Sequence, residues 1–120
     1  MNPLRLQRPR LRRQRLAAAL RYGLNNLDHI SPYLERGLHF QSFRRLYDAS
    51  REFLQGLFIA RRVYPIAYDK WIREQVVEIL GLPEVYRQLV QLFEIRCLES
   101  RELADKAQVL RELFRRYVVE

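Results

Sequence analysis

The sequence predicts an all-α protein, an antiparallel bundle of about five helices, and three observations lead to this prediction. Apolar residues recur at spacings of three and four along most of the 120-residue chain, which is the period of an amphipathic helix. Glycine and proline are scarce, with four and five residues, and most of them fall between the periodic segments. No run of β-branched residues alternates with period two, so nothing in the sequence favours a strand.

The N-terminal segment differs from the rest of the chain in charge. Residues 1–21 hold seven arginines and no acidic residue, whereas residues 22–120 hold 15 basic and 14 acidic residues. We therefore predict a basic arm or linker over residues 1–10 and a helical bundle domain over residues 11–120. Because the net charge of +8 is concentrated at one end, it argues against a folded basic face that holds nucleic acid.

The first half of the chain predicts two helices with a shorter segment between them. Pro9 suits the first turn of a helix on which Leu16 and Leu27 share a face with Leu20 and Leu24. Ser31 and Pro32 are typical of a cap and a first-turn proline, and they predict a second segment that Gly37 interrupts. The longest helix follows and should end near Arg62; its wide apolar stripe comprises Phe40, Phe43, Leu46, Tyr47, Phe53, Leu54, Leu57 and Phe58.

The second half predicts three shorter helices. The first carries Tyr68, Ile72, Val76 and Ile79 on one face, with Trp71 beside them. Gly81-Leu82-Pro83 ends that helix and begins a short one with an apolar face formed by Val85, Leu89, Leu92 and Phe93. Ser100 is the expected N-cap of the last helix, whose apolar seam is Leu103, Ala107, Leu110, Phe114 and Tyr117.

Several kinds of chemistry are disfavoured by the residues present. His29, His39 and Cys97 are the only soft metal ligands, and no two of them lie three or four residues apart, so we expect no metal site. No glycine-rich phosphate loop occurs and nothing places a histidine beside Cys97, so we expect no catalytic residue. A single cysteine favours the cytoplasm, and no apolar run approaches the roughly 20 residues of a membrane span.

The basic arm contains the first candidate binding residues. If the arm is helical, Arg5, Arg8, Arg12 and Arg15 lie along one face, although Pro9 interrupts the stripe. Such a row of arginines is suited to phosphate groups or a nucleic-acid backbone. The alternative is a solvated linker or helix extension, and the lack of aromatic residues among the arginines favours that alternative over base stacking.

The segment from Tyr64 to Trp71 contains the second set, and we predict that it binds substrate through Tyr64, Tyr68, Asp69, Lys70 and Trp71. Pro65 fixes a junction between helices, where side chains project from a rigid scaffold. A lysine there suits a phosphate or carboxylate, and a tyrosine can stack or donate a hydrogen bond. The competing interpretation buries Tyr68 and Trp71 in the core and leaves Lys70 solvated. It is the favoured one for Tyr68 and Trp71, and for Tyr64 and Lys70 both remain open.

Two stretches, Phe53 to Arg62 and Tyr64 to Trp71, resemble the C-terminal helical domain of nucleotidyltransferase-like proteins. That group includes bacterial relatives of the aminoglycoside nucleotidyltransferases. The shared pattern is an aromatic-Leu stretch with a basic pair, then Tyr-Pro and Lys-Trp; Leu80-Gly81-Leu82-Pro83 and the helix around Lys106 are also similar, so the resemblance covers about residues 11–119. One departure is Ala60, where relatives often have asparagine before the basic pair.

The resemblance implies a helical domain that packs against an α/β catalytic domain and shapes the acceptor-substrate side of the cleft between them. In such proteins the catalytic domain binds Mg²⁺ and nucleotide through a Gly-Ser loop and paired aspartates. This chain contains neither a Gly-Ser dipeptide nor an Asp-x-Asp sequence. The implied role is therefore non-catalytic, with no cofactor in this chain and with a nucleotidyltransferase catalytic domain as partner in cis or in trans.

Two other classes of function stay open. One is a small helical nucleic-acid-binding or toxin–antitoxin-type protein that uses the arginine-rich arm. The other is a structural module that forms a homodimer through an apolar groove.

Overall fold

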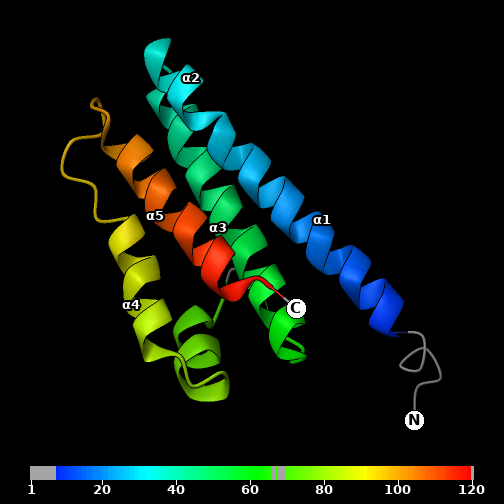
Figure 1. Ribbon diagram of the computed structural model, residues 1–120. Helices are drawn as coiled ribbons and strands as arrows, with labels where there is room; N and C mark the ends of the chain where they lie inside the picture. Colours follow the sequence, from blue (N-terminus) through cyan, green and yellow to red (C-terminus); the bar gives the residue numbers. More distant parts are fainter. Residues whose placement is uncertain (1–7, 66, 68–69, 120) are drawn as a thin grey trace.

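The computed structural model describes residues 8–65, 67 and 70–119, which form an all-α helical bundle (Figure 1). The prediction of an all-α fold is confirmed, and no strand occurs in these ranges. The elements are α1 (Arg8–Asp28), α2 (Ile30–Glu35), α3 (His39–Arg61), the π-helix η2 (Glu74–Ile79), α4 (Pro83–Leu92) and α5 (Glu102–Tyr117). Because α1 begins at Arg8, the last three residues of the predicted arm, 8–10, belong to a helix.

Helix α3 is the centre of the bundle and packs against α1, α2 and α5 (Figure 1). α1 and α3 run antiparallel along most of their length, as do α4 and α5. α3 and α5 run in the same direction, because η2 and α4 return the chain to the end at which α3 begins. The start of α1 and the ends of α3 and α5 consequently meet at one end of the molecule.

The core confirms most of the predicted apolar faces. Leu16 and Leu27 of α1 are buried, and so is every residue of the α5 seam except Tyr117, which is half-buried. Phe53 and Phe114, both fully buried, meet edge-on with ring centroids 5.4 Å apart. Burial of a large aromatic side chain contributes roughly 1.5–3 kcal/mol, so this pair anchors α3 against α5.

Glycine allows the closest helix contacts. A Cβ atom at Gly23 of α1 would overlap the Phe114 ring, and one at Gly56 of α3 would come within 2.6 Å of a Val118 methyl group. α5 and the residue that follows it therefore fit against α1 and α3 only because these two positions carry no side chain. The sequence pattern did not single out either glycine, since both lie inside helices.

Two predicted helix caps differ from the structure. α2 begins at Ile30 after His29, so Ser31 lies inside the first turn and its hydroxyl caps nothing. Arg101 precedes α5 directly, yet the Ser100 hydroxyl accepts a hydrogen bond from the Glu102 amide at 3.1 Å, one residue earlier than a standard cap.

Four of the predicted core residues that the structure describes are exposed, namely Phe40, Tyr47, Trp71 and Ile79. The Phe40 side chain, on the first turn of α3, is 80% exposed, although it belongs to the predicted stripe. Periodicity shows which side of a helix is apolar, but it does not show whether a neighbouring helix extends far enough to cover each turn. Trp71 is 61% exposed, so the favoured prediction that it belongs to the core is wrong.

The helix predicted to carry Tyr68 begins later than expected, and Tyr68 itself lies outside the described residues. Its first hydrogen bond joins the Gln75 amide to the Trp71 carbonyl, and from Glu74 the segment continues as a π-helix in which the Leu80 amide bonds to the Gln75 carbonyl. A π turn is wider than an α turn, so the stripe drifts around the axis. Val76 is buried, whereas Ile79 is 49% exposed.

Candidate functional site: a strained corner beside an arginine-lined groove

The chain leaves α3 through a corner that spans residues 62–71, and a strained residue stands at each end of it. Arg62 has φ +60° and Trp71 has φ +58°, and in the described part of the chain they are the only non-glycine residues with positive φ. A non-glycine residue in the left-handed region costs roughly 1–2 kcal/mol. Such strain persists only where the surroundings hold it, and it is concentrated at functional sites.

The α3 end of the corner is a tight helix stop. The Arg62 amide donates to the Ile59 carbonyl at 3.1 Å, and the Val63 amide donates to the Phe58 carbonyl at 3.0 Å. This pattern is the Schellman motif, in which a left-handed residue lets the last carbonyls of a helix find donors. It directs the chain away from α3 and leaves Tyr64 67% exposed.

The far end of the corner is held by Gln75, whose side chain is almost fully buried at 1% exposure. Its amide nitrogen donates to the carbonyls of Ala67 at 2.6 Å and Lys70 at 2.9 Å, and its amide oxygen accepts from the Ala67 amide at 3.4 Å. Buried polar side chains need such partners, because an unsatisfied buried amide costs about 1–3 kcal/mol. One side chain therefore fixes both Ala67 and the residue before Trp71.

The structure places three of the five predicted substrate-binding residues on the surface. Tyr64, Lys70 and Trp71 are exposed, whereas Tyr68 and Asp69 lie outside the described residues. Tyr64 lines a groove, and Lys70 and Trp71 do not. The corner thus presents an aromatic, a cationic and a second aromatic side chain from a fixed backbone.

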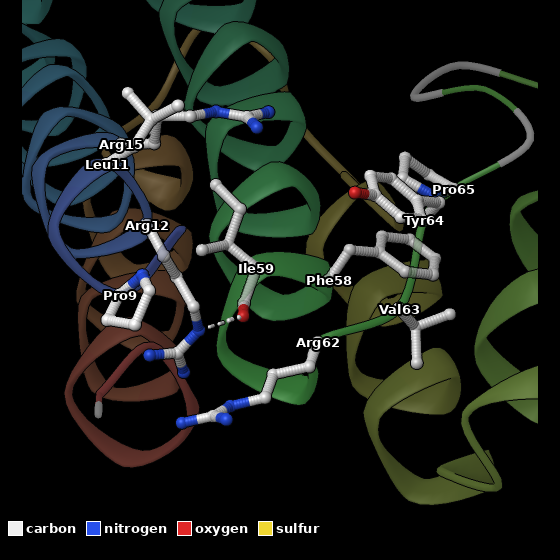
Figure 2. A pocket seen from close by; sticks show the side chains of 10 residues that line it. All are labelled: Pro9, Leu11, Arg12, Arg15, Phe58, Ile59, Arg62, Val63, Tyr64 and Pro65. Atoms are coloured by element: carbon white, nitrogen blue, oxygen red, sulfur yellow. Dashed lines mark hydrogen bonds between the residues drawn. The ribbon is translucent and has the colours of Figure 1, made fainter. Parts of the chain in front are cut away.

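The groove has a volume of about 500 Å³ and lies between the start of α1 and the end of α3 (Figure 2). α1 contributes Arg12 and Arg15 to its wall, and the chain after α3 contributes Arg62 and Tyr64. The remaining described lining residues are Pro9, Leu11, Phe58, Ile59, Val63 and Pro65. Residues of the N-terminal helix and of the corner, which were predicted as separate binding segments, therefore line one groove. Its wall combines apolar side chains with arginines.

Arg12, predicted as a phosphate contact, binds the protein itself. Its guanidinium group donates to the Ile59 carbonyl at 3.0 Å, drawn in Figure 2, and to the Ala60 carbonyl at 3.2 Å. These carbonyls lie in the last turn of α3, where the helix dipole is negative. Arg12 therefore joins α1 to α3 and offsets the negative potential that the end of α3 would give the groove.

Arg15 and Arg62 are the exposed cations of the groove. Neither side chain forms an ion pair with any described residue, and the described lining contains no acidic residue. Arg15 was among the predicted contacts, whereas Arg62 was predicted only as the end of a helix. Of the other two predicted arginines, Arg5 lies outside the described residues, and of Arg8 only the backbone is described.

A second hollow, of about 360 Å³, lies along α3 beside Asn26 near the end of α1. It is lined by both charges, with Arg44 and Arg51 beside Asp48 and Glu52. Burial raises the pKa of the Glu52 carboxyl, while the nearby Arg51 opposes that shift. Because its charges are balanced locally, this hollow lacks the excess of one sign that distinguishes the groove.

The described residues hold no group of three His, Cys, Asp or Glu side chains arranged for a metal ion. No helix in the ranges 8–65 and 70–119 has the length and apolar character needed to cross a membrane. Comparisons of the chain with protein-family models, with curated proteins and with solved structures find no match.

Proposed function

We propose that this chain is a non-catalytic helical domain of a nucleotidyltransferase-like protein. In this role the corner 62–71 faces the acceptor substrate, across a cleft from a catalytic domain that supplies Mg²⁺ and nucleotide. The proposal includes a cytoplasmic location, which the single cysteine favours.

The observation that carries the proposal is the strain at the corner. Two left-handed residues and one buried glutamine hold Tyr64, Lys70 and Trp71 away from the core. A chain that served only to fill the bundle would gain stability either by burying Trp71 or by placing glycine at position 71. Instead, the residues of the Tyr-Pro and Lys-Trp pattern, on which the resemblance depends, are those held at the surface.

Trp71 provides a direct test, because it is the only tryptophan in the chain and its fluorescence reports on the corner alone. We would titrate the chain with an aminoglycoside, a neutral sugar and nucleoside monophosphates, and follow the emission of Trp71. We expect at least one of these probes to shift or quench the emission. Lys70→Ala should then raise the dissociation constant about tenfold, equivalent to ~1.4 kcal/mol.

Lys106→Ala is the matched control, since Lys106 is the only other lysine and lies on α5, where it bonds to the Gln91 carbonyl. It should leave the dissociation constant within about twofold of the unmodified chain. Equal losses in both variants, or no response of Trp71 to any probe, would contradict the acceptor-side role. Transfer of label from α-labelled nucleoside triphosphates with Mg²⁺ by the chain alone would contradict the claim that it is non-catalytic.

A further inference from the structure

We propose that the groove between α1 and the end of α3 binds a small organic phosphate, with the phosphate on Arg15 and Arg62 and an apolar or aromatic body against the groove interior. This inference concerns a site separate from Lys70 and Trp71. It holds whether or not the chain works with a catalytic domain.

The charge of the groove selects an anion. Three guanidinium groups line it, and no acidic side chain is among the described lining residues. Arg15 and Arg62 are exposed, and neither forms an ion pair with a described residue. The unbalanced positive charge of these two side chains therefore favours an anionic ligand.

Arg12 contributes to the site through its hydrogen bonds to α3 and not by binding the ligand. By donating to the Ile59 and Ala60 carbonyls it covers the negative end of α3, which otherwise would repel a phosphate. Figure 2 shows the Arg12 and Arg62 side chains on the same side of the groove, at this end of α3. The end of α3, which directly precedes Arg62, therefore does not cancel the positive potential of the Arg62 side chain.

Two exposed guanidinium groups favour phosphate over a carboxylate. Arg15 and Arg62 approach from different elements, α1 and the corner, and each offers several N–H donors. A polyphosphate carries several negative charges near pH 7 and acceptor oxygens on each phosphorus, so it can reach both arginines, whose guanidinium groups lie apart in Figure 2. A single carboxylate has two oxygens and satisfies one arginine fork.

The interior of the groove selects a ligand that is more than an inorganic ion. Val63 and Pro65 are half-buried and provide apolar surface, the buried Phe58 lies behind them, and the exposed Tyr64 ring stands beside them (Figure 2). The volume of about 500 Å³ lies within the range of roughly 300–1,000 Å³ found for small-molecule sites. A phosphate joined to a flat or apolar group of nucleoside size uses the charge and the apolar surface together.

The test is isothermal titration calorimetry of the whole chain with three probes: ATP without divalent cations, adenosine, and inorganic tripolyphosphate. If both parts of the groove are used, ATP binds, and adenosine and tripolyphosphate each bind about tenfold more weakly or less. Arg15→Ala and Arg62→Ala should each raise the dissociation constant for ATP at least about fivefold. Tyr64→Leu should weaken ATP and leave tripolyphosphate unchanged.

The chain offers neighbouring arginines as matched controls. Arg13 of α1 and Arg61 of α3 are exposed and adjacent in sequence to groove residues, but neither lines the groove. Arg13→Ala and Arg61→Ala remove the same charge and should change ATP affinity less than about twofold. Circular dichroism of each variant confirms that the helical content is retained.

Three results would overturn the inference. The first is that no probe releases heat. The second is that tripolyphosphate binds as tightly as ATP with equal losses in the Arg13 and Arg15 variants, which would indicate diffuse attraction to the basic arm. The third is that a 12-nucleotide single strand binds more tightly than ATP, with Arg15 and Arg62 equally required, which would assign the groove to nucleic acid. The aminoglycoside and neutral-sugar titrations of Trp71 do not depend on these results, so the two proposals can fail independently.

Discussion

The middle of the bundle differs from the end that contains the corner and the groove, both in side-chain burial and in backbone strain. In the middle, α3 meets α5 through the fully buried pair Phe53 and Phe114, with ordinary helical backbone on both sides. At the end, the described residues between 62 and 71 form no regular helix, Arg62 and Trp71 are strained, and Trp71 is exposed. The first region gains stability from apolar burial, whereas the second keeps large side chains at the surface at a cost in backbone energy.

The difference predicts which residues determine stability and which determine binding. Substitutions in the middle should change the free energy of unfolding. The molecules that remain folded should bind ligands with unchanged affinity. Substitutions at the corner and groove should change binding with little loss of stability, except at Gln75, which belongs to both regions because it is buried while holding the exposed corner. The variants below test that separation.

The largest effect is expected from Phe53→Ala. Removal of a fully buried phenylalanine loses its transfer free energy and leaves a cavity beside Phe114, which together cost about 3–5 kcal/mol. Urea denaturation followed by circular dichroism measures the loss. The control is Trp71→Ala, an equally drastic truncation of a 61% exposed side chain, which should cost less than about 1 kcal/mol. Similar losses in the two variants would show that the corner is part of the core.

A second effect is expected from Gln75→Ala, which should lower the free energy of unfolding by about 1–3 kcal/mol. The loss arises because the carbonyls of Ala67 and Lys70 each lose a donor near a buried site. Unlike Phe53→Ala, this variant should also change the emission of Trp71 in the native state and speed tryptic cleavage after Lys70. Gln41→Ala, an exposed position on α3, is the control and should change neither property.

The sequence was sufficient for the bundle because its periodic apolar residues mark helix faces, as Leu16, Leu27 and the α5 seam show. It also located the corner, since Tyr64-Pro65 and the lone tryptophan stand out from the helical pattern. It failed at Trp71 and Arg62, because left-handed backbone in a non-glycine residue has no local signal and depends on what holds it. It also could not predict that Arg15 and Tyr64 line the same groove, because the groove forms only when α1 packs beside the end of α3.

A smaller effect is expected from Arg62→Gly, and here the change should be stabilising. Glycine adopts φ +60° without steric cost, and its greater chain entropy offsets only part of that gain, so we expect a rise of up to about 1 kcal/mol in the free energy of unfolding. The same variant removes a groove cation and should weaken binding of ATP. Arg61→Gly, one residue earlier and still helical, should instead destabilise by up to about 1 kcal/mol. A fall in stability for Arg62→Gly would mean that the Arg62 side chain contributes more to the fold than its strain costs.

The smallest effect is expected at Glu102, far from the groove at the opposite end of α5. Its carboxylate accepts hydrogen bonds from the Cys97 and Arg96 amides at 3.0 Å, and these bonds lower the pKa of that carboxyl below the usual 4.5. A group whose pKa is lowered by folding stabilises the protein above its unfolded pKa, and this contribution disappears as the pH falls through its folded pKa. Glu102→Gln should therefore be less stable than the unmodified chain at pH 7, and the gap should narrow below pH 4.5.

Urea titrations of both proteins between pH 3 and 7, with amide exchange at Arg96 and Cys97 as a local readout, measure this gap. Glu99→Gln is the control in the same connection, since Glu99 is exposed and accepts no hydrogen bond from a described residue, and it should leave amide exchange at Arg96 and Cys97 unchanged. A pH-independent gap for Glu102→Gln would show that the geometry of the side chain, and not its charge, holds the residues before α5. In either case the affinity of the groove for ATP should not change, because this connection and the groove lie at opposite ends of the bundle.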